Sequence, residues 1–260
     1  MNALWYPAPE SLRTRRGLTV HRWKHSSPTA SPVLLIHGFA SNALFNWVKT
    51  GWLDPMAALN RDLICVDLPG HGASREVNPA GLRMAHLIED LHELVGALGT
   101  PVAAHGYSLG SRIAWQFAYD HPDDVESLVM GGSPVSDEVY QVHPEQARRW
   151  AAGGPEPEDE ATRKFITVAA ALPDQHLQHV VELRLSLAHD VYAPSATVPQ
   201  VPTLVVAGDR DTIAEGADAL ADLVASHGNW SDFVSLPGRN HVNALTARTY
   251  KDAVVAFLTR

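Results

Sequence analysis

The sequence lacks several features that would restrict where the protein works. It holds a single cysteine, Cys65, which cannot form an internal disulfide, so we expect a reducing compartment, the cytoplasm. It has no apolar stretch of about 18 residues, the length that a membrane-spanning helix needs. Its first residues show no basic cluster followed by an apolar segment, so we expect no secretory signal peptide.

Positive charge is also scarce. The chain carries 20 Lys and Arg residues against 29 Asp and Glu residues, a formal net charge of −9. Nucleic acids and anionic membranes are bound through clusters of Lys and Arg, so neither is an expected partner. The 260 residues are 45% hydrophobic and 19% charged, which is typical of a globular protein with a sizeable core.

What the chain does contain is an alternation of short apolar runs and amphipathic segments. The clearest helix covers residues 84–98, where apolar residues recur at helical spacing until Gly99 ends it. The predicted strands are 17–24, 33–36, 61–66, 101–105, 125–130, 203–206 and 233–236; the other predicted helices are 112–119, 214–224, 249–258 and a short one capped by Asp54. This order predicts an α/β fold with a mostly parallel central sheet flanked by helices.

The alternation stops between residues 133 and 200. Three helical patterns, near 137–151, 160–172 and 174–189, follow one another there without a strand between them. This stretch is too short to fold alone. We therefore expect a small helical cap (133–200) inserted into an α/β core made of residues 1–132 and 201–260.

One five-residue stretch predicts a nucleophile. Gly106-Tyr107-Ser108-Leu109-Gly110 spells G-x-S-x-G between a predicted strand and a predicted helix. Such a turn must be sharp, and Gly106 and Gly110 lack the Cβ atom that would hold the backbones apart. The turn presents the hydroxyl of Ser108 outward, and the N–H of Leu109 opens the helix, where it faces developing negative charge.

Three further residues follow predicted strands. They are Phe39 in His37-Gly38-Phe39, Asp211 in Gly208-Asp209-Arg210-Asp211, and His241 in Gly238-Arg239-Asn240-His241. Ligands of parallel α/β sheets bind past the carboxyl ends of the strands. We therefore expect these residues to meet Ser108 at one edge of the sheet.

Together with the loop Asp67–Ser74, these motifs resemble the α/β-hydrolase fold superfamily from about residue 19 to residue 258. The order Ser, Asp, His is the one that this fold uses. The resemblance implies that Ser108 is the nucleophile, His241 the base and Asp211 the acid. It also implies an oxyanion hole made by the backbone N–H groups of Phe39 and Leu109.

Other acids and histidines compete for these roles. Asp209 is expected to support its turn, and Asp67 to brace its loop. Structural, hydrogen-bonded roles are expected for His37, His71, His105 and His121, and surface positions for His143, His176, His179 and His189. The pair His176-x-x-His179 has no third ligand near it in sequence, so we predict no metal and no cofactor.

The expected activity is hydrolysis of a carboxylic ester with a small or medium acyl group, through an acyl-enzyme on Ser108. Thioester hydrolysis and acyl transfer use the same intermediate and stay open. Carbon–carbon bond hydrolysis also stays open, although Val242 stands where such enzymes carry an aromatic residue. A ligand-binding receptor or non-catalytic scaffold on the same fold is the alternative from another class. The expected partner is a small-molecule ester, and the oligomeric state is left open.

Overall fold

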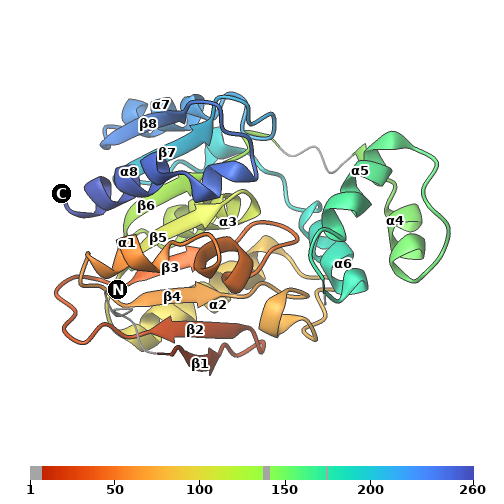
Figure 1. Ribbon diagram of the computed structural model, residues 1–260, viewed down its shortest axis with the longest axis horizontal. Coiled ribbons are helices and arrows are strands. Elements are labelled where there is room, and N and C mark those ends of the chain that lie inside the picture. Colours follow the sequence, from red (N-terminus) through yellow and green to blue (C-terminus); the bar gives the residue numbers. More distant parts are fainter. Residues whose placement is uncertain (1–7, 137–140, 174) are drawn as a thin grey trace.

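The computed structural model describes residues 8–136, 141–173 and 175–260, and its centre is an eight-stranded sheet (Figure 1). The strand order is β1-β2-β4-β3-β5-β6-β7-β8. The strands are β1 (Glu10–Arg13), β2 (Thr19–Trp23), β3 (Val33–Ile36), β4 (Leu63–Val66), β5 (Val102–Tyr107), β6 (Val125–Gly131), β7 (Thr203–Gly208) and β8 (Ser231–Leu236). Strand β2 is antiparallel to β1 and β4, and all other neighbours are parallel. The predicted α/β class with a mostly parallel sheet is confirmed.

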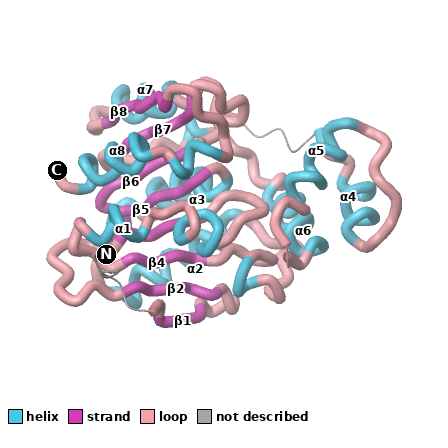
Figure 2. The backbone as a smooth tube through the Cα atoms, viewed as in Figure 1, coloured by secondary structure: helices cyan, strands magenta, loops and turns pink. Residues whose placement is uncertain are grey.

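Helices cover both faces of this sheet (Figure 2). On one face lie α1 (Leu53–Ala57) and α8 (Arg248–Leu258), and on the other lie α2 (Met84–Leu98), α3 (Leu109–Asp120) and α7 (Asp218–Ser226). Among the described residues, no helix is long and apolar enough to cross a membrane.

Strand β3 shows why the central strands read as continuous apolar runs. Leu34 and Ile36 pack on the face of α2, α3 and α7, whereas Val33 and Leu35 pack on the face of α1 and α8. All four are fully buried, since successive side chains of a strand point to opposite faces and both faces are covered. Burial of each such side chain stabilises the fold by roughly 1.5–3 kcal/mol.

The predicted and observed bounds of an element agree best where the sequence shows both an apolar pattern and a residue that ends the element. Helix α2 has the predicted bounds, and Gly99 ends it in the left-handed conformation at φ 70°. The prediction for α1 was wrong at its start: the N-cap is Trp52, and Asp54 lies inside the helix. Trp52 is already helical there because its fully buried indole is anchored, with Nε1–H donating to the Leu245 carbonyl at 3.0 Å. Strand β1 was not predicted, since all four of its residues are exposed.

Three more helices lie beyond the carboxyl ends of the strands, in the segment predicted as a cap (Figure 1). They are α4 (Pro144–Ala151), α5 (Glu160–Ala169) and α6 (Leu177–Leu187). They share a small apolar cluster that includes Ala147, Ile166 and Val180. The side chain of Asp159 caps α5 by accepting from the Thr162 N–H at 2.7 Å. The predicted starts of the first and third helices, Asp137 and Asp174, lie outside the described residues.

Candidate active site

Ser108 stands on a strained turn between β5 and α3. Its φ of 54° and ψ of −116° lie in a region that non-glycine residues rarely adopt. Its N–H donates to the Gly131 carbonyl at 2.8 Å, which ties the turn to β6. A Cβ on Gly106 would lie 2.2 Å from the Gly110 carbonyl oxygen, and a Cβ on Gly110 would lie 2.0 Å from the Ile36 carbonyl oxygen. The two glycines therefore permit the close approach that the sequence predicted.

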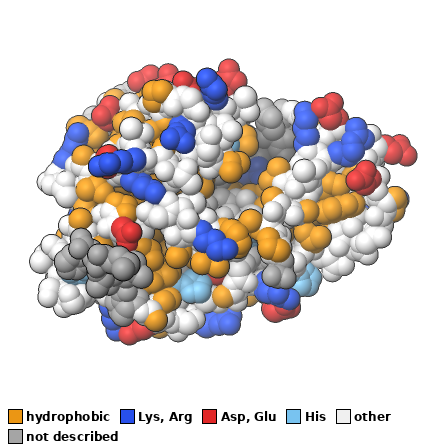
Figure 3. Space-filling view, in the orientation of Figure 1, with side chains coloured by type: hydrophobic (Ala, Val, Ile, Leu, Met, Phe, Trp, Pro, Cys, Tyr) orange, Lys and Arg blue, Asp and Glu red, His pale blue; other side chains and the backbone are white. Residues whose placement is uncertain are grey.

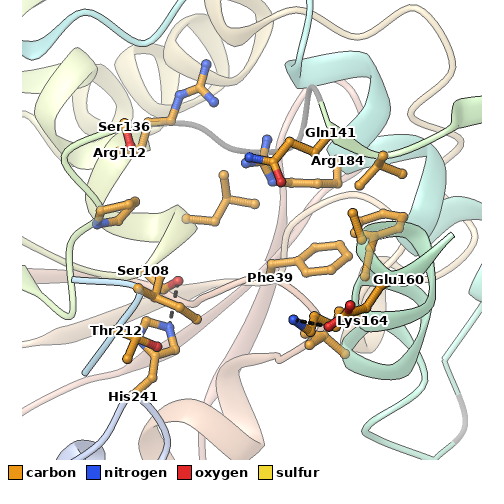
Figure 4. Close-up of a pocket in the computed structure, with 17 residues that line it drawn as sticks. Phe39, Ser108, Arg112, Ser136, Gln141, Glu160, Lys164, Arg184, Thr212 and His241 are labelled. Carbon is orange, nitrogen blue, oxygen red and sulfur yellow. Dashed lines mark hydrogen bonds and ion pairs between the residues drawn. The ribbon is translucent and has the colours of Figure 1, made fainter. Parts of the chain in front are cut away.

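The structure brings Ser108, His241 and Asp211 into one line of contacts. Nε2 of His241 lies 2.9 Å from the Ser108 hydroxyl oxygen (Figure 4). Nδ1 of the same ring lies 3.0 and 2.9 Å from the two carboxylate oxygens of Asp211. The Asp211 side chain is fully buried, and that of His241 is 21% exposed. A hydroxyl, an imidazole and a buried carboxylate in this order are the components of nucleophilic catalysis by serine.

The loops that carry the acid and the imidazole are held by further hydrogen bonds. Oδ1 of Asp211 accepts from the N–H groups of Ile213 and Ala214, at 3.0 and 3.1 Å. The neighbouring Asp209 accepts from the Gly238 N–H at 2.7 Å and does not touch the imidazole among the described contacts. Of these two carboxylates, only that of Asp211 contacts the imidazole in the described structure, and its role as the acid stays a prediction.

Tyr107, the residue before Ser108, also supports the imidazole. Its hydroxyl donates to the backbone carbonyl of His241 at 2.5 Å. Burial, with the nearby Asp211 carboxylate adding to it, raises the pKa of the Tyr107 phenol far above its usual value, so the group keeps its proton and remains a donor. The G-x-S-x-G motif does not predict this contact, because its pattern leaves open where the residue before the serine points.

The loop after β3 brings Phe39 to the same place. A Cβ on Gly38 would lie 3.3 Å from both the Ser108 Cβ and the Tyr107 carbonyl oxygen, so the backbone beside Phe39 lies directly against the turn at Ser108. Asn46 fixes this loop, since its buried Oδ1 accepts from the Gly38 N–H at 3.2 Å. Leu109 is the first residue of α3, a position whose N–H has no partner within the helix. Asn46 was not predicted, because it is a lone amide in a segment without a motif.

Buried, neutral histidines support the loops around the site. His37 accepts from the Leu68 N–H at Nε2 (2.9 Å) and donates from Nδ1 to the Gly38 carbonyl (2.7 Å). His71 accepts from the Ala40 N–H at 3.1 Å and donates to the Pro69 carbonyl at 2.8 Å. Burial lowers the pKa of His37 and lowers that of His71 to about 3, so both rings stay uncharged. These contacts match the structural roles predicted for them.

Asp67 and His105 also have structural partners. Asp67 accepts from the N–H groups of Ala43 and Ala73, each at 2.8 Å, as a residue that braces its loop should. Nε2 of His105 lies 2.8 Å from the Tyr250 hydroxyl, and burial lowers the pKa of His105 to about 3. Neither residue reaches Ser108 in the described contacts.

A cavity of about 740 Å³ opens beside Ser108, between the sheet and the helices α5 and α6. Its apolar lining includes Phe39, whose ring stacks on Phe165 of α5 at 5.4 Å between centroids and 8° between planes. Figure 3 shows hydrophobic side chains gathered along this junction. Charged groups line the α5 side, where Lys164 pairs with Glu160 at 2.7 Å (Figure 4). The histidines of the helical segment, His143, His176, His179 and His189, are not among the described lining residues.

Two clusters of histidines contain possible metal ligands, and neither cluster lines this cavity. The rings of His176 and His179 stack at 3.6 Å, without a carboxylate or third imidazole close enough to complete a site among the described residues. His92, His121 and Asp124 do form a group of three possible ligands, at the far end of α3 from Ser108.

A family model for the alpha/beta hydrolase fold matches residues 31–186. The chain belongs to the α/β-hydrolase fold family. The matched residues of this α/β-hydrolase include the turn at Ser108 and the loop that carries Phe39. They end before Asp211 and His241, whose assignment depends on the geometry described above.

Two curated relatives carry enzyme names. The chain is 25% identical over 228 residues to the monoacylglycerol lipase ABHD6 of Homo sapiens, covering 75% of this chain and 66% of that one. It thus spans just under two thirds of the length of that relative. It is also 27% identical over 209 residues to a pimeloyl-[acyl-carrier protein] methyl ester esterase of Neisseria meningitidis, covering 79% of this chain and 73% of that one.

Solved structures share the whole fold. A thermophilic esterase from Thermogutta terrifontis superposes with a TM-score of 0.72 at 21% identity, covering 98% of both chains. A hydrolase from Pseudomonas aeruginosa PA01 gives a TM-score of 0.73 at 22% identity, covering 97% of this chain and 98% of that one. At this identity the two structures bear on the fold alone.

Proposed function

We propose that this α/β-hydrolase cleaves a carboxylic ester of a small or medium acyl group through an acyl-enzyme on Ser108. One observation carries the proposal: an unbroken line of hydrogen bonds runs from the buried carboxylate of Asp211 through His241 to the Ser108 hydroxyl. This line ends at a cavity large enough for a small molecule.

In the first half of the reaction, Ser108 attacks the ester carbonyl. A serine hydroxyl is a weak nucleophile, so Nε2 of His241 takes its proton as the new bond forms. The carboxylate of Asp211 keeps the proton of the imidazole on Nδ1 and stabilises the imidazolium that forms. His241 then gives the proton to the departing alcohol, which leaves the acyl group on Ser108.

The carbonyl oxygen becomes negatively charged at this step. We assign its stabilisation to the backbone N–H groups of Phe39 and Leu109, two residues that line the cavity together with Ser108. Loss of one such donor typically raises the barrier by about 3 kcal/mol. In the second half, His241 deprotonates a water molecule, which releases the acid and restores Ser108.

The cavity favours an acyl chain as the bound group. The stacked rings of Phe39 and Phe165 offer an apolar wall, and we assign α4 to α6 the role of a cap that closes over it. The two curated relatives are named for a lipase and an esterase, and both names denote esters of acyl chains. A cytoplasmic location remains part of this proposal, in keeping with the single buried cysteine.

The test is steady-state hydrolysis of p-nitrophenyl esters with graded acyl chains, run beside a matched thioester. We expect repeated turnover, with Ser108→Ala at least about 10³-fold slower. A cavity of this size should favour acyl chains of a few to about ten carbons over the acetyl ester.

The same assay separates the alternatives. Release of at most one product per molecule would support a receptor or scaffold and would contradict the proposal. Preference for the thioester would keep Ser108 and change the substrate class. Undiminished turnover by Ser108→Ala would overturn the assignment of the nucleophile.

A further inference from the structure

A cluster of three metal-ligating side chains lies at the end of α3 that faces away from Ser108. It consists of His92 on α2, with His121 and Asp124 at the short 3₁₀ helix η3 (Pro122–Asp124). The twelve residues of α3 separate the cluster from the nucleophile by about 18 Å, at 1.5 Å per residue. The cluster is therefore remote from the proposed chemistry.

The local backbone explains why these groups meet. A 3₁₀ helix has three residues per turn, so residues i and i+3 lie above one another. His121 is the N-cap of η3 and Asp124 its last residue, which places imidazole and carboxylate on one side. His92 on the neighbouring α2 stacks its ring on that of His121, at 4.1 Å between centroids and 18° between planes.

The distances suit a small cation. Nδ1 of His92 and Nδ1 of His121 lie 2.6 and 3.9 Å from the same Asp124 oxygen, and possible ligand atoms of all three residues lie within 4.8 Å of one another. Ligands about 2.0–2.1 Å from a tetrahedral Zn²⁺ stand about 3.3 Å apart, between the two observed values. An imidazole binds a metal through a lone pair that lies in its ring plane, so the stacked rings of His92 and His121 would have to separate for both Nδ1 atoms to point at the ion. The half-exposed His92 side chain is the one free to turn.

The chemistry of the ligands points to a class of metal. Two imidazoles and one carboxylate suit Zn²⁺ and similar divalent transition metals, whereas Ca²⁺ and Mg²⁺ prefer sites made of oxygen. The segment 120–124 carries Asp120, Asp123 and Asp124 and no Lys or Arg, so the local charge also favours a cation. Among the described residues, this is the one group of three such side chains with ligand atoms this close.

We propose that His92, His121 and Asp124 form a surface site for a divalent transition metal of the Zn²⁺ type. Three protein ligands leave one position of a tetrahedral ion open to water. The ion would join α2 to the turn between α3 and β6. Its effect would therefore be on the stability of the fold rather than on the ester reaction, because the site lies at the opposite end of α3.

The experiment uses the full chain without a polyhistidine tag, freed of metal by a chelator. Calorimetric titration with ZnCl₂ should give one site, and the melting temperature should rise by about 5 °C at about 100 times the dissociation constant. Co²⁺ should give the visible absorption of a tetrahedral ion. His92→Ala and His121→Ala should each weaken binding at least tenfold and remove the rise in melting temperature.

Two controls separate loss of the proposed site from general effects of the substitutions. The double variant His176→Ala/His179→Ala removes the other stacked pair of histidines and should bind Zn²⁺ as the unaltered protein does. The melting temperature of each variant in chelator shows whether it still folds. Absence of stoichiometric binding, or equal binding by the unaltered protein and by folded His92→Ala and His121→Ala, would overturn the proposal.

Discussion

At the scale of single residues, the site is built around one unfavourable conformation. Ser108 holds a positive φ, which typically costs about 1–3 kcal/mol in a residue with a Cβ. The surrounding structure compensates through the bond from the Ser108 N–H to Gly131 and the contact of the hydroxyl with His241. The strain keeps the hydroxyl at the cavity, so it belongs to the proposed function.

Comparison of Asp211→Asn with Asp209→Asn tests the assignment of the acid. The amide at 211 would offer N–H₂ or a neutral oxygen to the imidazole, so the correct tautomer and the stabilised cation are both lost. We expect kcat to fall by about 10³- to 10⁴-fold. At 209 the amide oxygen can still accept from the Gly238 N–H, so kcat should change less than about threefold. The reverse ranking in ester hydrolysis would move the acid to Asp209.

The sequence predicted the residues with motifs and missed those without them. Ser108, Asp211 and His241 each follow a strand within a recognisable pattern, and the structure brings the three together. Asn46 and Tyr107 belong to the second group. Their side chains form hydrogen bonds with backbone groups, Asn46 with the Gly38 N–H and Tyr107 with the His241 carbonyl. No periodicity or spacing marks such partners, because the contact joins segments far apart in the chain.

At the scale of elements, the close packing of the start of α3 against the ends of β3 and β5 sets the geometry of the turn at Ser108. Strand β5 ends at Tyr107 and α3 begins at Leu109, so one residue reverses the chain. Gly110 in the first turn of α3 lies against the carbonyl of Ile36 at the end of β3. This contact places the N-terminus of α3 beside the loop that follows β3 and carries Phe39.

Gly110→Ala should disrupt the packing of α3 against β3, because the new Cβ would lie 2.0 Å from the Ile36 carbonyl oxygen, a rigid backbone atom. We expect a loss of about 3 kcal/mol or more in the free energy of unfolding, by urea titration. Gly96→Ala is the matched control in α2, where a Cβ meets nothing within 4 Å. It should stabilise the protein by about 0.5–1 kcal/mol. Equal effects of the two substitutions would contradict the close approach at Gly110.

Elements were predicted best where two signals coincide. Helix α2 has both an apolar stripe and a glycine at its end, and its bounds agree with the prediction. The start of α1 is set by the buried Trp52, a tertiary cause that outweighs the capping preference of Asp54. Strand β1 pairs with β2 through its backbone while its side chains remain exposed, so its sequence shows no apolar signal.

At the scale of the whole molecule, folding buries several histidines in their uncharged form. His37 and His71 support the loops beside the site, and His105 lies in β5 against Tyr250. All three are fully buried. Their burial couples the stability of the fold to pH.

Acid should therefore destabilise the protein well before its carboxylates titrate. Folding lowers the pKa of His71 and His105 to about 3, from about 6.5 in the unfolded chain. Between these values the unfolded chain binds more protons, so the free energy of unfolding falls as pH falls. The stability is fully retained above about pH 6.5. Below that, each ring contributes a slope of up to about 1.4 kcal/mol per pH unit.

Urea unfolding at a series of pH values measures this slope. His105→Gln can keep a hydrogen bond to Tyr250. It should reduce the pH slope of the free energy of unfolding by the contribution of one imidazole. His189→Gln, on an exposed side chain of the helical segment, should leave the slope unchanged. A flat profile between about pH 6.5 and pH 4 would show that these rings are not held neutral.

Covalent labelling with a serine-reactive fluorophosphonate, mapped by mass spectrometry of the intact and digested protein, checks the proposed nucleophile and base together. We expect one adduct per chain, on Ser108. It should form at least about 10²-fold more slowly in His241→Ala, because no imidazole takes the hydroxyl proton. An adduct on another residue, or an equal rate of labelling without His241, would contradict these assignments.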